Sequence, residues 1–119
     1  MSSAEDPSRA WFLDHVRSKP LLDGVLAVEA QPSAATQVEL AEAFPDVPER
    51  ALETARSRAR QLLAMADEWG RAGHDAMREG RDAEERLRAA LERQFENDFP
   101  DFTRDSMSTV YGVGLRTNR

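Results

Sequence analysis

The chain contains no cysteine among its 119 residues and no apolar run long enough to cross a bilayer. The lack of cysteine excludes disulfides, thiolate zinc sites, iron–sulfur clusters and cysteine nucleophiles. A membrane-spanning helix needs about 20 predominantly apolar residues, so we expect no membrane span. Small secreted domains usually depend on disulfides, and the first six residues are polar and acidic rather than a basic signal-peptide start. We therefore expect a cytoplasmic protein.

Lysine and tyrosine are scarce, with one residue of each, whereas arginine and alanine are abundant. Such usage is common in GC-rich bacterial genomes, so we expect a bacterial protein and infer no function from the bias. The 22 acidic residues outnumber the 16 basic ones, and the formal net charge is −6. An acidic chain repels nucleic acid unless its basic residues cluster. The one basic block of note contains Arg50, Arg56, Arg58 and Arg60.

The length fits a single domain, 1–119, in which we expect residues 1–6 and 117–119 to be frayed. Strand patterns are missing and strong helix formers dominate. The sequence therefore predicts an all-α fold, a small helical bundle of about five helices. We expect the first helix to begin after Pro7 and to end before Pro20, and the second to span Leu21 to about Glu29. The first helix offers three apolar residues to a core: Trp11, Phe12 and Val16.

Capping patterns mark further helix starts. Thr36 with Glu39 three residues later predicts a third helix that runs through Val38 to Phe44. Asp46 is the expected cap of the next helix, with a proline in its first turn. A last helix is expected over 103–115, with a short strand at 110–115 as the alternative.

Residues 48–98 carry an almost continuous helix signal, and their apolar and small residues follow a 3,4 spacing. One helix of that length would be about 75 Å long, which exceeds the size of a compact domain. Glycine weakens a helix, and Asp82 begins a new capping pattern. We expect a break between Gly70 and Arg81 and an antiparallel helical hairpin, with one long helix as the alternative. The stripe consists of Leu52, Ala55, Ala59, Leu62, Ala66, Trp69, Gly73, Ala76, Gly80, Ala83, Leu87 and Ala90.

This stripe motivates the functional prediction. Small residues allow close helix contact but bury little area each. A monomer of this size has too few other elements to bury the whole stripe. The sequence predicts a non-enzymatic helical interaction protein, an accessory subunit, adaptor or regulator, that binds another protein or forms a homodimer. Tryptophan is enriched at binding hot spots, so Trp69 is the best anchor; an ordinary core residue is the alternative. The expected partner-binding residues are Trp69, Leu62, Ala66, Phe95 and Phe99, and contacts are also expected at the aromatic residues Trp11 and Phe102.

Patterns for catalysis or metal binding are missing. His15 and His74 each adjoin an aspartate, but adjacent residues on a helix point apart and do not chelate together. Ser106 and Ser108 lack the strand and glycines of a nucleophile elbow. The Gly-Val-Gly at 112–114 lacks the third glycine of a phosphate-binding loop and instead favours tight helix packing. We expect no enzyme activity, no metal and no cofactor.

One local pattern supports an alternative function. Residues 36–44, the turn at 45–48 and residues 49–55 resemble a helix-turn-helix, over about twenty residues. The turn is one residue longer than usual, and no wing hairpin follows. The resemblance implies a DNA-binding transcriptional regulator that uses residues 36–60, although a solvated acidic and basic helix face is the simpler interpretation. The resemblance implies that Glu49, Arg50, Glu53 and Arg56 face the DNA, two of which are acidic. The expected nucleic-acid contacts of this alternative are Arg50, Arg56 and Arg60.

Overall fold

A computed structural model describes residues 7–31 and 38–118, and every regular element within these ranges is a helix. This confirms the predicted all-α fold, although the described ranges hold seven helices rather than about five. No helix in them is long and apolar enough to span a bilayer. The length alone predicts one domain, whereas the chain divides into two compact units, Met1–Arg60 and Gln61–Arg119.

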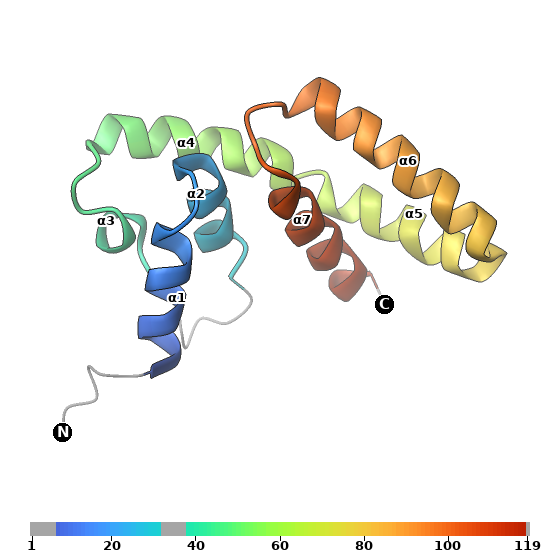
Figure 1. Cartoon of the computed structure of the whole chain (residues 1–119), viewed down its shortest axis with the longest axis horizontal. Coiled ribbons are helices and arrows are strands. Elements are labelled where there is room, and N and C mark those ends of the chain that lie inside the picture. Colours follow the sequence, from blue (N-terminus) through green and yellow to red (C-terminus); the bar gives the residue numbers. More distant parts are fainter. Residues whose placement is uncertain (1–6, 32–37, 119) are drawn as a thin grey trace. The chain divides into compact units, whose positions relative to one another are not determined.

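The first unit contains α1 (Pro7–Arg17), α2 (Leu21–Glu29), α3 (Leu40–Ala43) and most of α4 (Glu49–Leu63) (Figure 1). Helices α1 and α2 begin and end close to the prolines that predict them. Helix α1 packs against both α2 and α3. One cluster of buried side chains joins α1, α2, Val38 and α3, with Phe12, Leu13 and Phe44 among the half-buried residues packed against it. The buried side chains of this cluster are Val16, Val28, Val38 and Ala43.

Helix α3 is shorter than the predicted third helix. It begins at Leu40, with Glu39 as its N-cap residue, so the prediction that Val38 is helical is wrong. The Gln31 side chain explains the difference: its Oε1 accepts from the Val38 N–H at 3.0 Å, and its Nε2 donates to the Val38 carbonyl at 3.2 Å. A side chain that engages both backbone groups competes with helix formation. The predicted cap, Thr36, lies outside the described residues.

The predicted cap of α4 is also wrong. Helix α4 begins at Glu49, and the carbonyl of Pro48 accepts its first hydrogen bond, from the Leu52 N–H at 3.1 Å. Asp46 lies in a turn before the helix, which the Val47 N–H closes onto the Phe44 carbonyl at 3.2 Å.

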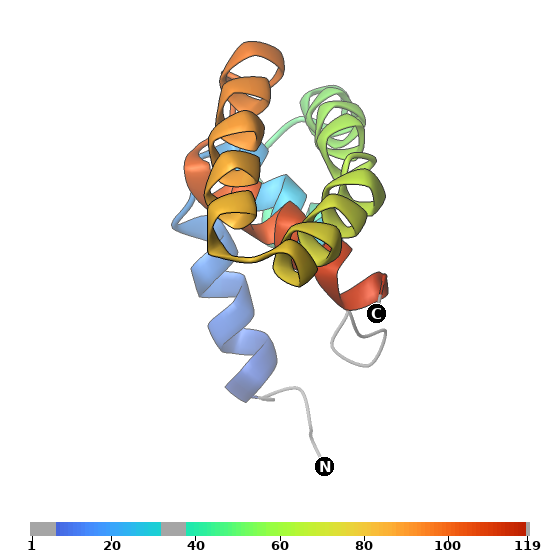
Figure 2. The ribbon, with the colours of Figure 1, turned by 90° about the vertical axis from the view of Figure 1, so that its right-hand side faces the viewer.

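The second unit contains the end of α4 followed by α5 (Ala66–Glu79), α6 (Arg81–Asp98) and α7 (Arg104–Thr117). Figures 1 and 2 show α5 and α6 side by side and antiparallel, which confirms the predicted hairpin. Gly80 alone joins them, with φ +116°, a backbone conformation that side-chain-bearing residues rarely adopt. Because α6 already begins at Arg81 with Gly80 as its N-cap, the predicted cap at Asp82 is wrong.

A second interruption, which the sequence pattern does not predict, separates α4 from α5 at residues 64–65. Met65 keeps helical dihedrals, φ −77° and ψ −12°, but its N–H donates to the Leu62 carbonyl at 3.0 Å. This three-residue spacing is typical of a 3₁₀ turn. The normal spacing resumes where the Trp69 N–H donates to the Met65 carbonyl at 2.9 Å.

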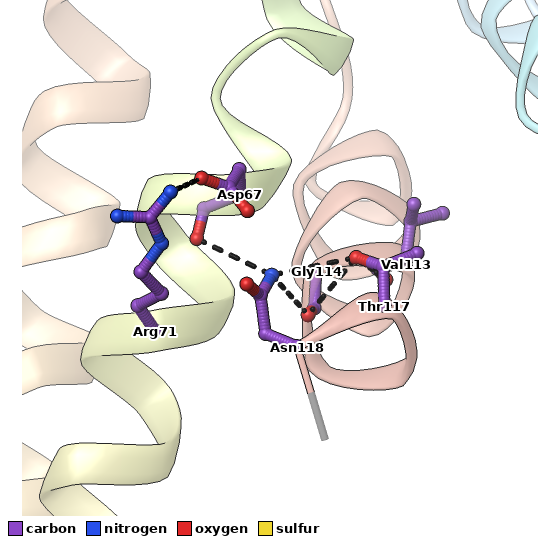
Figure 3. Close-up of polar contacts among 6 residues, drawn as sticks. All are labelled: Asp67, Arg71, Val113, Gly114, Thr117 and Asn118. Atoms are coloured by element: carbon purple, nitrogen blue, oxygen red, sulfur yellow. Dashed lines mark hydrogen bonds and ion pairs between the residues drawn. The ribbon is translucent and has the colours of Figure 1, made fainter.

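Helix α7 confirms the predicted helix over 103–115 and packs closely on α5 through two glycines. A Cβ built on Gly114 would overlap the Ala66 carbonyl and lie 2.9 Å from the Gly70 nitrogen, so the helices meet backbone to backbone. At the end of α7, the Asn118 Nδ2 donates to the Gly114 carbonyl at 2.9 Å and reaches the Asp67 carbonyl of α5 at 3.5 Å (Figure 3). Thr117, which the sequence predicts to be frayed, is the last residue of α7.

The predicted small-residue stripe is buried from Leu52 to Ala76 but not throughout α6. Ala90 is exposed, and α6 instead buries Leu91 and Phe95, which are four residues apart. Gly80 explains the change, because its non-helical backbone resets the rotational phase between α5 and α6.

Candidate interaction surface

The most exposed large apolar side chain among the described residues is Trp11 of α1, at 65% exposure. Its ring stacks on His15, one helical turn later, with centroids 4.9 Å apart and an interplanar angle of 7°. Helix α1 buries Val16, and Phe12 and Leu13 pack against the same core. The prediction that Trp11 joins the core is therefore wrong. We call the exposed pair Trp11 and His15 the Trp11 face.

Polar contacts hold α1 against α3 behind this face. Arg17 donates from Nε to the Ala43 carbonyl at 2.8 Å and from Nη2 to the Glu42 carbonyl at 2.9 Å. These bonds satisfy carbonyls at the end of a one-turn helix that would otherwise lack partners. Arg9 also pairs with the Glu42 carboxylate, and this hydrogen bond lowers the pKa of Glu42 below its ordinary value of 4.5.

A close approach of α2 fixes the other side of α1. A Cβ on Gly24 would lie 2.9 Å from the Val16 carbonyl and 2.7 Å from the Phe44 ring. Such distances leave no room for a methyl group without movement of the backbone or the ring. The helix that carries Trp11 is therefore held on two sides by elements of its own unit.

The five residues predicted to bind a partner are all buried in the structure. Trp69 is 1% exposed, and its indole N–H donates to the Gln94 Oε1 of α6 at 3.1 Å. The rings of Phe95 and Phe99 lie 6.3 Å apart, and Phe99 in turn contacts Phe102 edge to face at 6.2 Å. Leu62 and Ala66 are buried as well. In this conformation these side chains form core and offer no surface to a partner, as the alternative interpretation of Trp69 expects.

The arginines implied by the helix-turn-helix resemblance lie on α4. Two of them share one carboxylate: Arg56 Nε lies 3.2 Å and Arg60 Nε 2.8 Å from the Glu29 oxygens. Arg50 is exposed. The four-residue α3 is shorter than the nine residues that the resemblance assigned to the first helix of the motif. The shared carboxylate lowers the positive charge that Arg56 and Arg60 present to a phosphate.

A cavity of about 580 Å³ lies between the C-terminal end of α2 and α4. Its volume falls within the range of ligand pockets, roughly 300–1,000 Å³. Among its apolar lining residues, Val28, Val38 and Leu52 are nearly fully buried, whereas Leu40 is half-buried and Ala41 is exposed. Its charged lining consists of Glu29, Glu39, Glu49, Glu53, Arg56 and Arg60.

The two histidines lie in different units and serve different contacts. His15 stacks on Trp11, whereas the His74 Nε2 hydrogen-bonds the Leu115 carbonyl of α7 at 2.8 Å. Within residues 7–31 and 38–118, no three His, Asp or Glu side chains converge as a metal site would require.

The sequence offers Trp11 both to a core and to a partner, and it also contains a signal that separates these two interpretations. Phe12 and Val16 are four residues apart and define the inward row of α1. Trp11 and His15 are also four apart, and the polar His15 marks their row as the outward one.

No family model, curated protein or solved structure matches this chain.

Proposed function

We propose that this chain is a non-enzymatic helical interaction protein, an accessory subunit, adaptor or regulator, whose partner covers the Trp11 face. The partner is another protein or a second copy of this chain. The observation that carries the proposal is the 65% exposure of Trp11 on a helix whose other large apolar side chains pack inward.

Burial at an interface gives tryptophan a large contribution to the free energy of binding. A tryptophan at the centre of an interface is among the residues whose truncation most often weakens binding, by about 2 kcal/mol or more. Met77 is the other large apolar side chain exposed among the described residues, at 47%. Met77 lies on α5 rather than on α1, so it serves as a control that is also apolar and exposed but does not belong to the Trp11 face.

The rigidity of the Trp11 face supports the same function. Helix α1 is held by the Arg17 bonds to α3 and by the close approach of Gly24. The Trp11 ring itself rests on His15. A side chain that is already ordered loses less conformational entropy on binding, so more of its burial appears as affinity.

The experiment compares three immobilised baits in extract of the native host: the wild-type chain, Trp11→Ala and Met77→Ala. Recovered material is quantified by mass spectrometry and by nucleic-acid staining. We expect one protein in stoichiometric amount with the wild type and Met77→Ala, and at least tenfold less with Trp11→Ala. Light scattering of the purified wild type and of Trp11→Ala tests the homodimer in the same way.

Two results would contradict the proposal. The first is a monodisperse monomer that recovers no stoichiometric protein. The second is recovery of nucleic acid that depends on Arg50 and on low salt, because release of counterions makes phosphate contacts salt-dependent. That second result would favour the DNA-binding regulator instead.

A further inference from the structure

We draw no further inference here: the strongest candidate, the cavity of about 580 Å³ between the C-terminal end of α2 and α4 in the first unit, is rimmed by an exposed acidic cluster of Glu39, Glu49 and Glu53, and no second observation in the described residues points to a ligand for it.

Discussion

Different kinds of contact stabilise the interior of each of the two units of this chain. The first has an aliphatic buried core and directed polar contacts, such as the Gln31 amide on Val38 and Arg17 on the end of α3. The second buries four aromatic side chains, Trp69, Phe95, Phe99 and Phe102, and has a backbone-to-backbone approach of Gly70 and Gly114. Polar contacts can fix the position of a helix that buries little apolar area, whereas close packing needs complementary shapes along the length of the helix.

The two tryptophans make the same contrast within one residue type. Trp69 is 1% exposed and has its indole N–H paired, while Trp11 is 65% exposed and stacks only on its own helix. One stabilises the fold, and the other is available to a partner. Residue type alone therefore does not separate a core anchor from a surface anchor, but its position relative to the inward row of its helix does.

The largest expected effect separates these two tryptophans by stability. Trp69→Ala removes a buried aromatic side chain and should lower the free energy of unfolding by about 3–5 kcal/mol. Trp11→Ala removes an exposed side chain and should change it by no more than about 0.5 kcal/mol. Urea unfolding followed by circular dichroism measures both. Equal losses in the two variants would break the distinction between core and surface tryptophan.

The next effect tests the close approach of α5 and α7. Gly114→Ala places a methyl group against the Ala66 carbonyl and should destabilise the chain by about 1–3 kcal/mol, because backbone atoms cannot move aside cheaply. Gly112→Ala is the matched control on the same helix, where the new Cβ would meet only an Arg116 nitrogen at 3.5 Å. That control should stabilise the chain by about 0.4–1 kcal/mol. Opposite signs in thermal unfolding support the account, and a neutral Gly114→Ala contradicts it.

A smaller effect tests the polar contacts of the first unit. Gln31→Ala removes both hydrogen bonds to the Val38 backbone, which are part-buried, at a cost of about 0.5–1.5 kcal/mol. Gln31→Glu keeps an acceptor for the Val38 N–H but loses the donor to its carbonyl. Amide hydrogen exchange at Val38 should therefore be fastest in Gln31→Ala and intermediate in Gln31→Glu. Unchanged protection in both variants would mean that the Gln31 contacts do not hold this segment.

The smallest effect is the pH dependence of the α1–α3 contact. The hydrogen bond from Arg9 lowers the pKa of Glu42 below 4.5, so its contribution to stability is present above that pH. The contribution is lost as the pH falls through the lowered pKa. Glu42→Gln should therefore be less stable than the wild type at neutral pH, and the difference should vanish in acid. The effect should also shrink with added salt, since both partners are partly exposed. A difference that persists in acid would show that Glu42 acts through packing.

The helical architecture was largely predictable because it follows from periodicity and from proline and glycine. Pro7 and Pro20 bracket α1, and the hairpin turns at Gly80 inside the predicted interval. The caps were less predictable, because Asp46 and Asp82 match a capping pattern that the backbone does not use. The start of α3 depends on Gln31, which is seven residues before Val38 and lies outside any helix signal.

Helix periodicity, proline and glycine predict the candidate site less well than they predict the helices. The expected contacts followed the small-residue stripe, and within one chain a stripe that binds a partner has the same spacing as one that forms the core. Leu62, Ala66 and Trp69 are buried by the chain itself. Trp11 belonged to no stripe. Tertiary packing buries Trp69, whereas the outward row that Trp11 shares with His15 follows from the spacing along α1.

The most direct test of the central claim is the solvent accessibility of Trp11 in the complex. In Trp69→Phe, Trp11 is the one remaining tryptophan of this chain. Incorporated as 5-hydroxytryptophan, which is excited at longer wavelength than the tryptophans of a partner, it gives an acrylamide-quenching signal from that side chain alone. The measurement compares the isolated variant with the complex that it forms with the recovered partner, or with its own dimer. The account predicts strong quenching in the isolated chain and several-fold weaker quenching in the complex. Equal quenching in both states would contradict the claim that the partner covers Trp11.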